Sequence, residues 1–427
     1  MKKTIILSIV AMMAATSCLN LDFYPHNAIS RYDVNEDDIQ LFYYGLYNCS
    51  QYKPTLNGYF FDDIIGGDLV RAGGSSAGMG ARDLIEGLVM PTGFVGGVWN
   101  GYYAWLYQVN CFIISANALP ASSDKDKYLG TGYFFRGLIY YNLTAKWREV
   151  PIVDTPTNES LPKSSEAECW AYTEDNLRKA ADLLGDFGGD NTFVSRQAAQ
   201  ALLARTLLAQ GKLDAAAKCA ETVITSGFFS LDSYDNIWSG ATNKEVIFCY
   251  ANTGAEENGL VMSSYFRGAP NYVPTSAFES QVVTSDERYP YLSYADGVYT
   301  TLNKYNTYGG YDPIVVCRLS EMYLISAEGK GRKDGVARLN DLRAKRGLAP
   351  HGVFTNDDSF IDAILAERRL ELVQEGFRWF DLVRTGRYST LMGLDPKYMV
   401  MPLPSAQVER SNGKLIQHTL WAAESSN

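Results

Sequence analysis

Two stretches of this chain have the pattern of a helical hairpin with a glycine turn, and this pattern narrows the possible folds more than any other feature. The first stretch predicts helices at 195–209 and 213–226. The second predicts helices at 319–331 and 334–346, with Gly347 as the stop. Helix axes approach closely only where the side chains between them are small. The first stretch has such residues at Ala198, Ala201, Ala204, Ala209, Ala216 and Ala220.

A helix, a glycine turn and a second helix within roughly 30 residues resemble a tetratricopeptide unit, although an ordinary antiparallel hairpin has the same pattern. Because two such units occur, we expect a mainly α fold of tetratricopeptide-like helix pairs, around 125–227 and 318–386. Residues 228–316 between them are rich in Gly, Asn, Ser and Pro, with short apolar runs such as 246–250. That composition predicts a loop-rich subdomain containing short β-strands.

Hydrophobic periodicity predicts five further helices. They are expected at 35–49, 98–118, 125–147, 168–184 and 360–385.

The last of these helices would carry Glu367, Glu371 and Glu375 at i, i+4 and i+8. Like charges at this spacing destabilise an isolated helix slightly. The column could be a catalytic carboxylate cluster. We interpret it instead as structural ion pairs, because Arg368, Arg378 and Arg384 lie in the same segment and a packed neighbour can supply more.

The N-terminus has the pattern of a secretory signal. Lys2 and Lys3 precede an apolar run at 4–15, and small residues then lead into Cys18. A cysteine at this place is typical of a bacterial lipoprotein, so we expect a signal peptide at 1–17 and acylation of Cys18. An extended leader at 18–34 would then tether a single body at 35–427 to a membrane. The plainer alternative is a secreted protein in which this cysteine is incidental.

Composition excludes several functions. The formal charge is −10 with no basic stripe, which argues against nucleic acid as a partner. Only three histidines occur, at His26, His351 and His418, so we expect no metal site. No phosphate loop or nucleophile elbow is found, and we expect no cofactor and no catalytic residues. Six of the seven cysteines are widely spaced, which favours buried free thiols.

Five segments and a closing motif match one known family in combination. They are Cys18 with Leu21, Asp22 and Pro25; Trp99, Tyr103 and 110–117; Phe135 and Arg136 through Trp147 to Pro151; 318–348; 367–384; and Met401 to Pro404 with Gln417. Together they resemble the SusD/RagB family of outer-membrane lipoproteins from Bacteroidota.

The resemblance implies a set of tetratricopeptide-like helix pairs with a loop-rich subdomain. It also implies a non-catalytic lipoprotein at the cell surface that binds glycans, or in some members peptides. Members deliver this nutrient to a SusC-like TonB-dependent transporter in the outer membrane. Two alternatives stay open: a surface glycoside hydrolase, and a helical-repeat scaffold that binds a protein or peptide partner.

Aromatic residues make up 13% of the chain, and tyrosine exceeds phenylalanine. Rings with a polar edge suit the faces of sugars, which are half apolar and half wet. Two clusters are therefore candidates for ligand binding, the first of which matches the family's binding face at Trp99 and Asn100. The expected ligand residues are Trp99, Asn100, Tyr102 and Tyr103 with Asp68 and Arg71 nearby, and Tyr291, Tyr294, Tyr305 and Tyr308 in the second cluster.

Each cluster also has a structural interpretation. Rings at helical spacing, as in the first cluster, are most often buried in a core. Strand tyrosines, as in the second, often support one another across a small sheet. We expect at least one ring from each cluster to contact the ligand.

Overall fold

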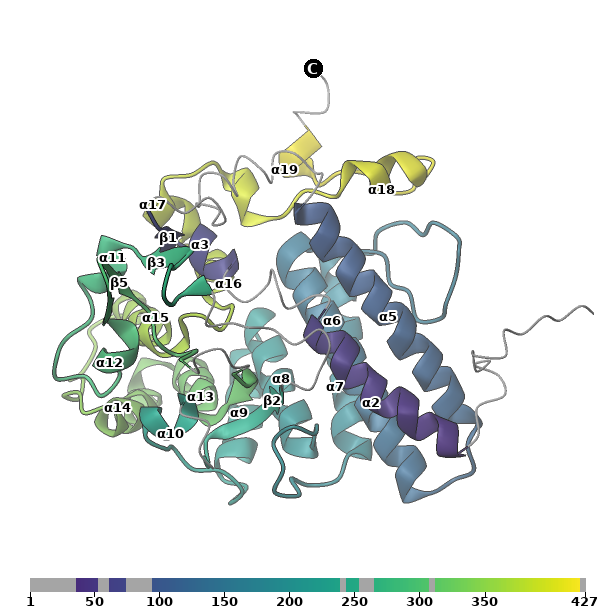
Figure 1. Ribbon diagram of the computed structural model, residues 1–427, viewed down its shortest axis with the longest axis horizontal. Coiled ribbons are helices and arrows are strands. Elements are labelled where there is room, and N and C mark those ends of the chain that lie inside the picture. The colour runs from purple at the N-terminus through teal and green to yellow at the C-terminus, as the bar shows by residue number, and fades with distance from the viewer. Residues whose placement is uncertain are drawn as a thin grey trace, which may run out of the picture.

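The structure is a computed structural model that describes residues 36–52, 61–73, 94–238, 243–252, 265–306 and 312–422. Figure 1 shows that these residues are mainly helical, as expected. The signal peptide, Cys18, the leader and Tyr308 lie outside the described residues, and the predictions for them stay predictions. Within the described ranges, no helix is both long enough and apolar enough to span a bilayer.

One part of the molecule is a series of antiparallel helices in which each helix packs against the next. Helix α2 lies along α5 and also contacts α6. These helices are α2 (Glu36–Tyr52), α5 (Phe94–Ala118), α6 (Ser123–Trp147), α7 (Glu166–Leu183), α8 (Arg196–Ala209) and α9 (Leu213–Ile224).

The sequence signals for these helices act as expected. Ser165 caps α7 in a reciprocal capping box with Glu168, so α7 begins two residues earlier than predicted. Ser195 is the N-cap of α8, and its side chain accepts a hydrogen bond from the backbone N–H of Ala198. All but one of the small residues singled out above are fully buried, namely Ala198, Ala201, Ala204, Ala216 and Ala220.

The second helical pair packs on the first. Helices α13 (Leu319–Asp334) and α14 (Val336–Lys345) form the predicted hairpin, and α13 lies against α9. Gly331, at φ 72°, interrupts α13 where the turn was expected. Gly329 allows the close approach to α9, because a Cβ there would lie 2.5 Å from the carbonyl oxygen of Leu213. The predicted helix pairs are therefore confirmed, and the two pairs pack against each other.

The predicted helix at 360–385 is wrong as one element. The structure has α15 (Asp357–Leu372) and α16 (Arg378–Arg384), separated by a turn. Gln374 at φ 66° and Gly376 at φ 79° hold this turn in the left-handed region, which ends an α-helix. Glu375 consequently lies in the turn and not on the helical face with Glu371.

The subdomain between the helical parts has short strands, as expected, in three two-stranded antiparallel sheets. β1 (Leu69–Arg71) pairs with β3 (Tyr272–Pro274), and β4 (Tyr294–Asp296) pairs with β5 (Tyr299–Thr301). The third sheet joins β2 (Val246–Tyr250) to β6 (Ile314–Arg318).

The remaining short elements lie before or between the strands in the sequence, or in the C-terminal part of the chain. They are α3 (Phe61–Ile65), α10 (Tyr234–Trp238), α11 (Ser276–Glu279), α12 (Tyr289–Leu292), α17 (Tyr388–Met392), the 3₁₀ turn η2 (Pro396–Met399), α18 (Ser405–Arg410) and α19 (Thr419–Ala422).

The cysteines whose side chains are described are free thiols, in agreement with the sequence. Three of them are buried and two are half-buried. Burial raises the pKa of the Cys169 thiol to about 11, so this group is a small apolar core residue rather than a nucleophile.

Candidate functional site

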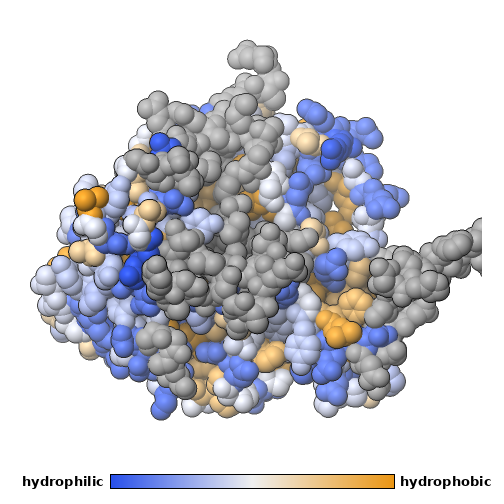
Figure 2. Space-filling view, in the orientation of Figure 1, coloured by the Kyte–Doolittle hydropathy of each residue, from blue (hydrophilic) through white to orange (hydrophobic). Residues whose placement is uncertain are grey.

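A pocket of about 330 Å³ lies between the first half of α5, the loop at 148–165 and α18. Figure 1 shows these three segments next to one another at the upper right of the molecule. Figure 2, drawn from the same side, shows mostly hydrophilic residues around α18 and this loop, with apolar residues between them. The pocket is therefore a mixed apolar and polar site on the surface, not an interior cavity.

One wall of the pocket is a row of three rings on α5. Trp99, Tyr103 and Tyr107 are four residues apart, so they stand on one helical face with a rise of about 6 Å between them. Their exposure increases along the row, from 4% at Trp99, through the half-buried Tyr103, to 49% at Tyr107. The row thus offers ring surface that is anchored at one end and open to solvent at the other.

The core holds the anchored end of this row in place. The Trp99 and Tyr103 ring centroids are 4.8 Å apart, and the Trp147 ring meets Trp99 edge-on at 5.1 Å. Trp147 in turn donates its indole N–H to the carbonyl oxygen of Pro402 at 2.9 Å. These contacts fix the ring orientations before any ligand arrives.

The 148–165 loop is fastened to α5 through its backbone carbonyls. The Tyr103 hydroxyl donates to the carbonyl oxygen of Pro151 at 3.0 Å, and the Asn110 amide donates to that of Val153 at 2.8 Å. Burial raises the pKa of Tyr103 well above its ordinary value, so this hydroxyl stays a donor. These two hydrogen bonds therefore hold the loop that forms the far wall of the pocket against α5.

Polar groups converge on the same space. Gln407 on α18 donates its amide N–H to the side-chain oxygen of Asn100 at 2.9 Å. This leaves the second half of each amide, the Asn100 NH₂ group and the Gln407 oxygen, without a protein partner among the described residues. Asn158 and Glu159 line the loop side and are exposed. Rings beside amide donors and acceptors can stack on an apolar ring face while bonding hydroxyl groups at its rim.

The structure separates the sequence-predicted residues into two groups. Trp99, Asn100 and Tyr103 line the pocket. Tyr102 is 3% exposed and points into the core, away from this face. Asp68 is fully buried, and its carboxylate pairs with the Arg369 guanidinium at 2.5 Å, so it is not presented to a surface ligand.

Arg71 lies on β1 and is exposed, but it does not line the pocket. The described tyrosines of the second cluster do not line it either. Tyr305 is fully buried and donates its hydroxyl to the carbonyl oxygen of Gln374 at 3.2 Å. Tyr291 is 8% exposed and bonds Asp235.

Tyr294 is the half-buried tyrosine of that cluster, on β4. The Arg267 guanidinium lies 4.5 Å from the centre of its ring and also donates to its hydroxyl at 3.3 Å. One ring face is therefore already occupied by a cation.

Tyr107, Glu159 and Gln407 also line the pocket, although they were not among the predicted ligand residues. Tyr107 has a signal in the sequence, because it continues the i, i+4, i+8 row. Glu159 and Gln407 have none, since only the folded chain brings the 148–165 loop and α18 to α5.

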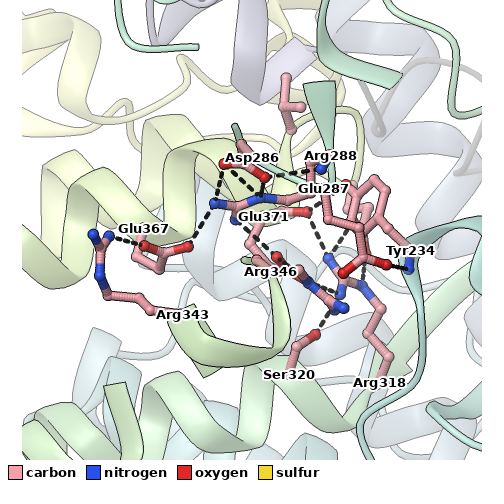
Figure 3. A network of polar contacts seen from close by, with 12 residues as sticks. Tyr234, Asp286, Glu287, Arg288, Arg318, Ser320, Arg343, Arg346, Glu367 and Glu371 are labelled. Carbon is pink, nitrogen blue, oxygen red and sulfur yellow. Dashed lines mark hydrogen bonds and ion pairs between the residues drawn. The ribbon is translucent and has the colours of Figure 1, made fainter. Parts of the chain in front are cut away.

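The glutamate column forms a buried ion network, shown in Figure 3. Glu371 bonds three guanidinium groups, those of Arg288, Arg318 and Arg346. Burial alone would raise the pKa of Glu371, but these cations outweigh it and hold that pKa well below its ordinary value. The interpretation as structural ion pairs is confirmed.

The source of the arginines differs from the expectation. Arg368 and Arg384 bond Asp381, not the glutamate column. The arginines that bond the column come from other elements of the fold. Arg368 directly follows Glu367 in the helix and therefore points to a different side of it. The network joins five acidic and five basic residues: Glu245, Asp286, Glu367, Glu371 and Glu375 with Arg288, Lys304, Arg318, Arg343 and Arg346.

Two family models match this chain. The SusD family model matches residues 236–402, and a second model, described as starch-binding and associating with the outer membrane, matches residues 22–208. SusD-like protein P38 from Formosa agariphila is 25% identical over 371 residues, which cover 69% of this chain and 73% of that protein.

Solved structures show the same fold. A laminarin-binding SusD-like protein superposes with a TM-score of 0.79 at 22% identity, over 90% of this chain and 99% of that one. Surface glycan-binding protein A from Bacteroides thetaiotaomicron, in complex with laminarihexaose, gives 0.76 at 17% identity, over 90% and 99% of the two chains. The helix pairs, the small sheets and both family matches agree: this chain belongs to the SusD/RagB family.

Proposed function

We propose that this protein binds glycans at the cell surface, without cleaving them, in the pocket beside α5. The observation that carries the proposal is the row of Trp99, Tyr103 and Tyr107 beside two side-chain amides. The NH₂ group of Asn100 and the amide oxygen of Gln407 remain available to a ligand. Two structural relatives support a glycan as the ligand, since one is a laminarin-binding protein and the other was solved in complex with laminarihexaose.

The chemistry of the pocket supports binding rather than hydrolysis. Glycoside hydrolysis ordinarily uses two carboxyl groups about 5–9.5 Å apart. All residues that line this pocket are described, and Glu159 is the one carboxylate among them. The buried glutamates of the ion network are engaged by guanidinium groups and have no access to a surface ligand.

The proposal includes an anchor and a partner. Acylation of Cys18 would tether the body to the outer membrane, with which the matching family model is described as associating, and the body would face the exterior. The bound glycan would then pass to a SusC-like TonB-dependent transporter. Stacking on an open surface desolvates few atoms, so we expect an affinity near micromolar or weaker, which suits release to a transporter.

Calorimetry with a panel of oligosaccharides tests the proposal. Tyr107→Ala should weaken binding of the glycan that the natural protein binds by about tenfold, because a stacked ring contributes on the order of 1.4 kcal/mol. Tyr44→Ala is the matched control, since Tyr44 is 50% exposed but lies outside the pocket.

An unchanged affinity of the Tyr107 variant would place glycan binding elsewhere. Reducing ends released during incubation with the bound glycan would overturn the non-catalytic role.

A further inference from the structure

We infer that the pocket beside α5 selects linear chains of uncharged sugars and binds them along the helix axis, with stacking on the accessible rings of Tyr103 and Tyr107. The inference rests on the proposed function and adds to it the charge class and the direction of the ligand.

The charge of the pocket argues against acidic sugars. Among the lining residues, every one of which is described, none is a lysine, arginine or histidine, and Glu159 is the one charged side chain. A uronate or sulfated sugar would bring negative charge toward this carboxylate and lose part of its hydration without gaining a cationic partner. The formal charge of −10 on the whole chain acts in the same direction.

Among the described side chains, two cations contact residues of the pocket wall, and both are engaged there. The Arg136 guanidinium is buried and donates to the side-chain oxygens of Asn110 at 3.3 Å and Asn176 at 3.0 Å. The second cation is Lys414. Its ammonium donates to the carbonyl oxygen of Ser160 at 2.9 Å, so it is engaged with the loop backbone. Lys414 itself does not line the pocket. An anionic ligand therefore finds no free guanidinium or ammonium group among the lining side chains.

The polar groups that are free suit hydroxyls. The Asn100 NH₂ group is a donor and the Gln407 amide oxygen is an acceptor, and the hydrogen bond between the two amides fixes both orientations. A hydroxyl group can accept from the first and donate to the second, whereas a carboxylate can only accept. The amide pair thus suits a sugar hydroxyl and gives a carboxylate only one of its two contacts.

The direction follows from the row of rings. From Trp99 to Tyr107 the helix rises about 12 Å, which is longer than one pyranose ring. Because the exposed ring area increases toward Tyr107, a chain that lies along α5 can stack at that end and continue into solvent. A ligand lying across the helix would meet only one ring of the row.

The test compares neutral and acidic chains of equal length by calorimetry. Laminarihexaose, cellohexaose, maltohexaose and xylohexaose are the neutral probes, and hexagalacturonate and hexamannuronate are the acidic ones. We expect at least one neutral chain to bind at least tenfold more tightly than both acidic chains. For that chain, affinity should rise from the disaccharide to the tetrasaccharide and then level off.

Charge variants sharpen the test. Glu159→Lys should increase affinity for the acidic chains several-fold, and added salt should abolish the gain because the new contact is exposed. Glu409→Lys is the matched control, since Glu409 lies on α18 outside the lining and its replacement introduces the same charge. It should give no comparable gain.

The outcomes separate the inference from the proposed function. Equal or tighter binding of an acidic chain by the natural protein would overturn the inference and leave glycan binding in place. Equal affinity for a disaccharide and a hexasaccharide would overturn the direction along α5. If none of the probes and no other glycan in a polysaccharide screen bound, the proposed function itself would fail.

Discussion

Replacing Glu371 with glutamine should cost this protein a large part of its stability, although the two side chains have nearly the same shape. Glu371 is fully buried and bonds three guanidinium groups, with contacts of 2.8 Å to Arg288 and to Arg346. Arg318 makes the third contact. These three arginines are themselves at most 1% exposed, so no water can replace the carboxylate.

The magnitude follows from the charge count. The network has five acidic and five basic residues, so Glu371→Gln leaves one buried positive charge uncompensated. Removing one partner of a buried ion pair typically costs about 3–5 kcal/mol. Since a folded domain is stable by about 5–15 kcal/mol, the variant should lose roughly a fifth or more of its free energy of unfolding.

Urea denaturation followed by far-UV circular dichroism measures this loss as a change in midpoint at constant slope. Asp175→Asn is the matched control, because Asp175 pairs with Lys179 at 2.7 Å and both side chains are about half exposed. The control makes the same carboxylate-to-amide change, and it should cost no more than about 0.5 kcal/mol.

The two variants also differ in their response to acid. The pKa of Glu371 is lowered in the folded state, so its contribution is present above its unfolded value near 4.5 and is lost as the pH falls below it. The difference in stability between the natural protein and Glu371→Gln should therefore shrink in acid. A variant within 1 kcal/mol of the natural protein at neutral pH would refute the view that this carboxylate compensates the buried arginines.

Three further predictions concern packing, titration and capping. Gly329→Ala should cost about 1–3 kcal/mol, because its Cβ would lie 2.5 Å from the carbonyl oxygen of Leu213, whereas Gly352→Ala, with nothing within 4 Å, should cost little. Burial and the neighbouring carboxylate of Asp68 raise the pKa of Asp63 well above its ordinary 3.8 in the folded state. The free energy of unfolding should therefore fall as the pH rises above that unfolded value, and Asp63→Asn should gain stability relative to the natural protein over the same rise in urea titrations. Ser165→Ala removes the N-cap of α7 and should lower the thermal midpoint by the equivalent of about 1 kcal/mol.

The helix pairs could be predicted from the sequence because their signals are local. Glycine stops, the serine caps and the small residues all act within a few positions of the chain, and α8, α9, α13 and α14 lie close to their predicted bounds. The break between α15 and α16 was missed because Gly376 is the one local sign of it. The helical pattern on both sides is strong enough to hide a single glycine in a turn.

The partners of the glutamate column were also beyond local reasoning. Arg288, Arg318 and Arg346 come from α12's N-terminal flank, β6 and the end of α14. Their sequence distances from Glu371 are 83, 53 and 25 residues, so only the tertiary packing shows that they meet. Counting charges within one segment indicated ion pairs correctly and assigned the wrong arginines.

The candidate site was predicted in part, because α5 is aromatic on more than one face. Trp99, Tyr103 and Tyr107 form the face toward the pocket, whereas Tyr102 and Trp105 are buried at 3% and 1% exposure. A helix that is apolar or aromatic all round gives no periodic signal for which face is covered. The choice depends on α6 and the 148–165 loop, which the sequence of α5 does not specify.

The abundance of tyrosine has a structural explanation that composition alone conceals. Several buried or half-buried tyrosines donate their hydroxyls to backbone carbonyls of loops, turns or a helix end: Tyr103 and Tyr140 to Pro151, Tyr234 to Glu371, and Tyr305 to Gln374. A loop packed against helices has carbonyls that no ladder satisfies, and an unsatisfied buried acceptor costs about 1–3 kcal/mol. Tyrosine fills the core and satisfies the carbonyl with one side chain, which phenylalanine does not. In such a fold, a high tyrosine content therefore indicates mainly that irregular segments pack against helices. It indicates a ligand-binding surface only where the ring is exposed to solvent, as at Tyr107.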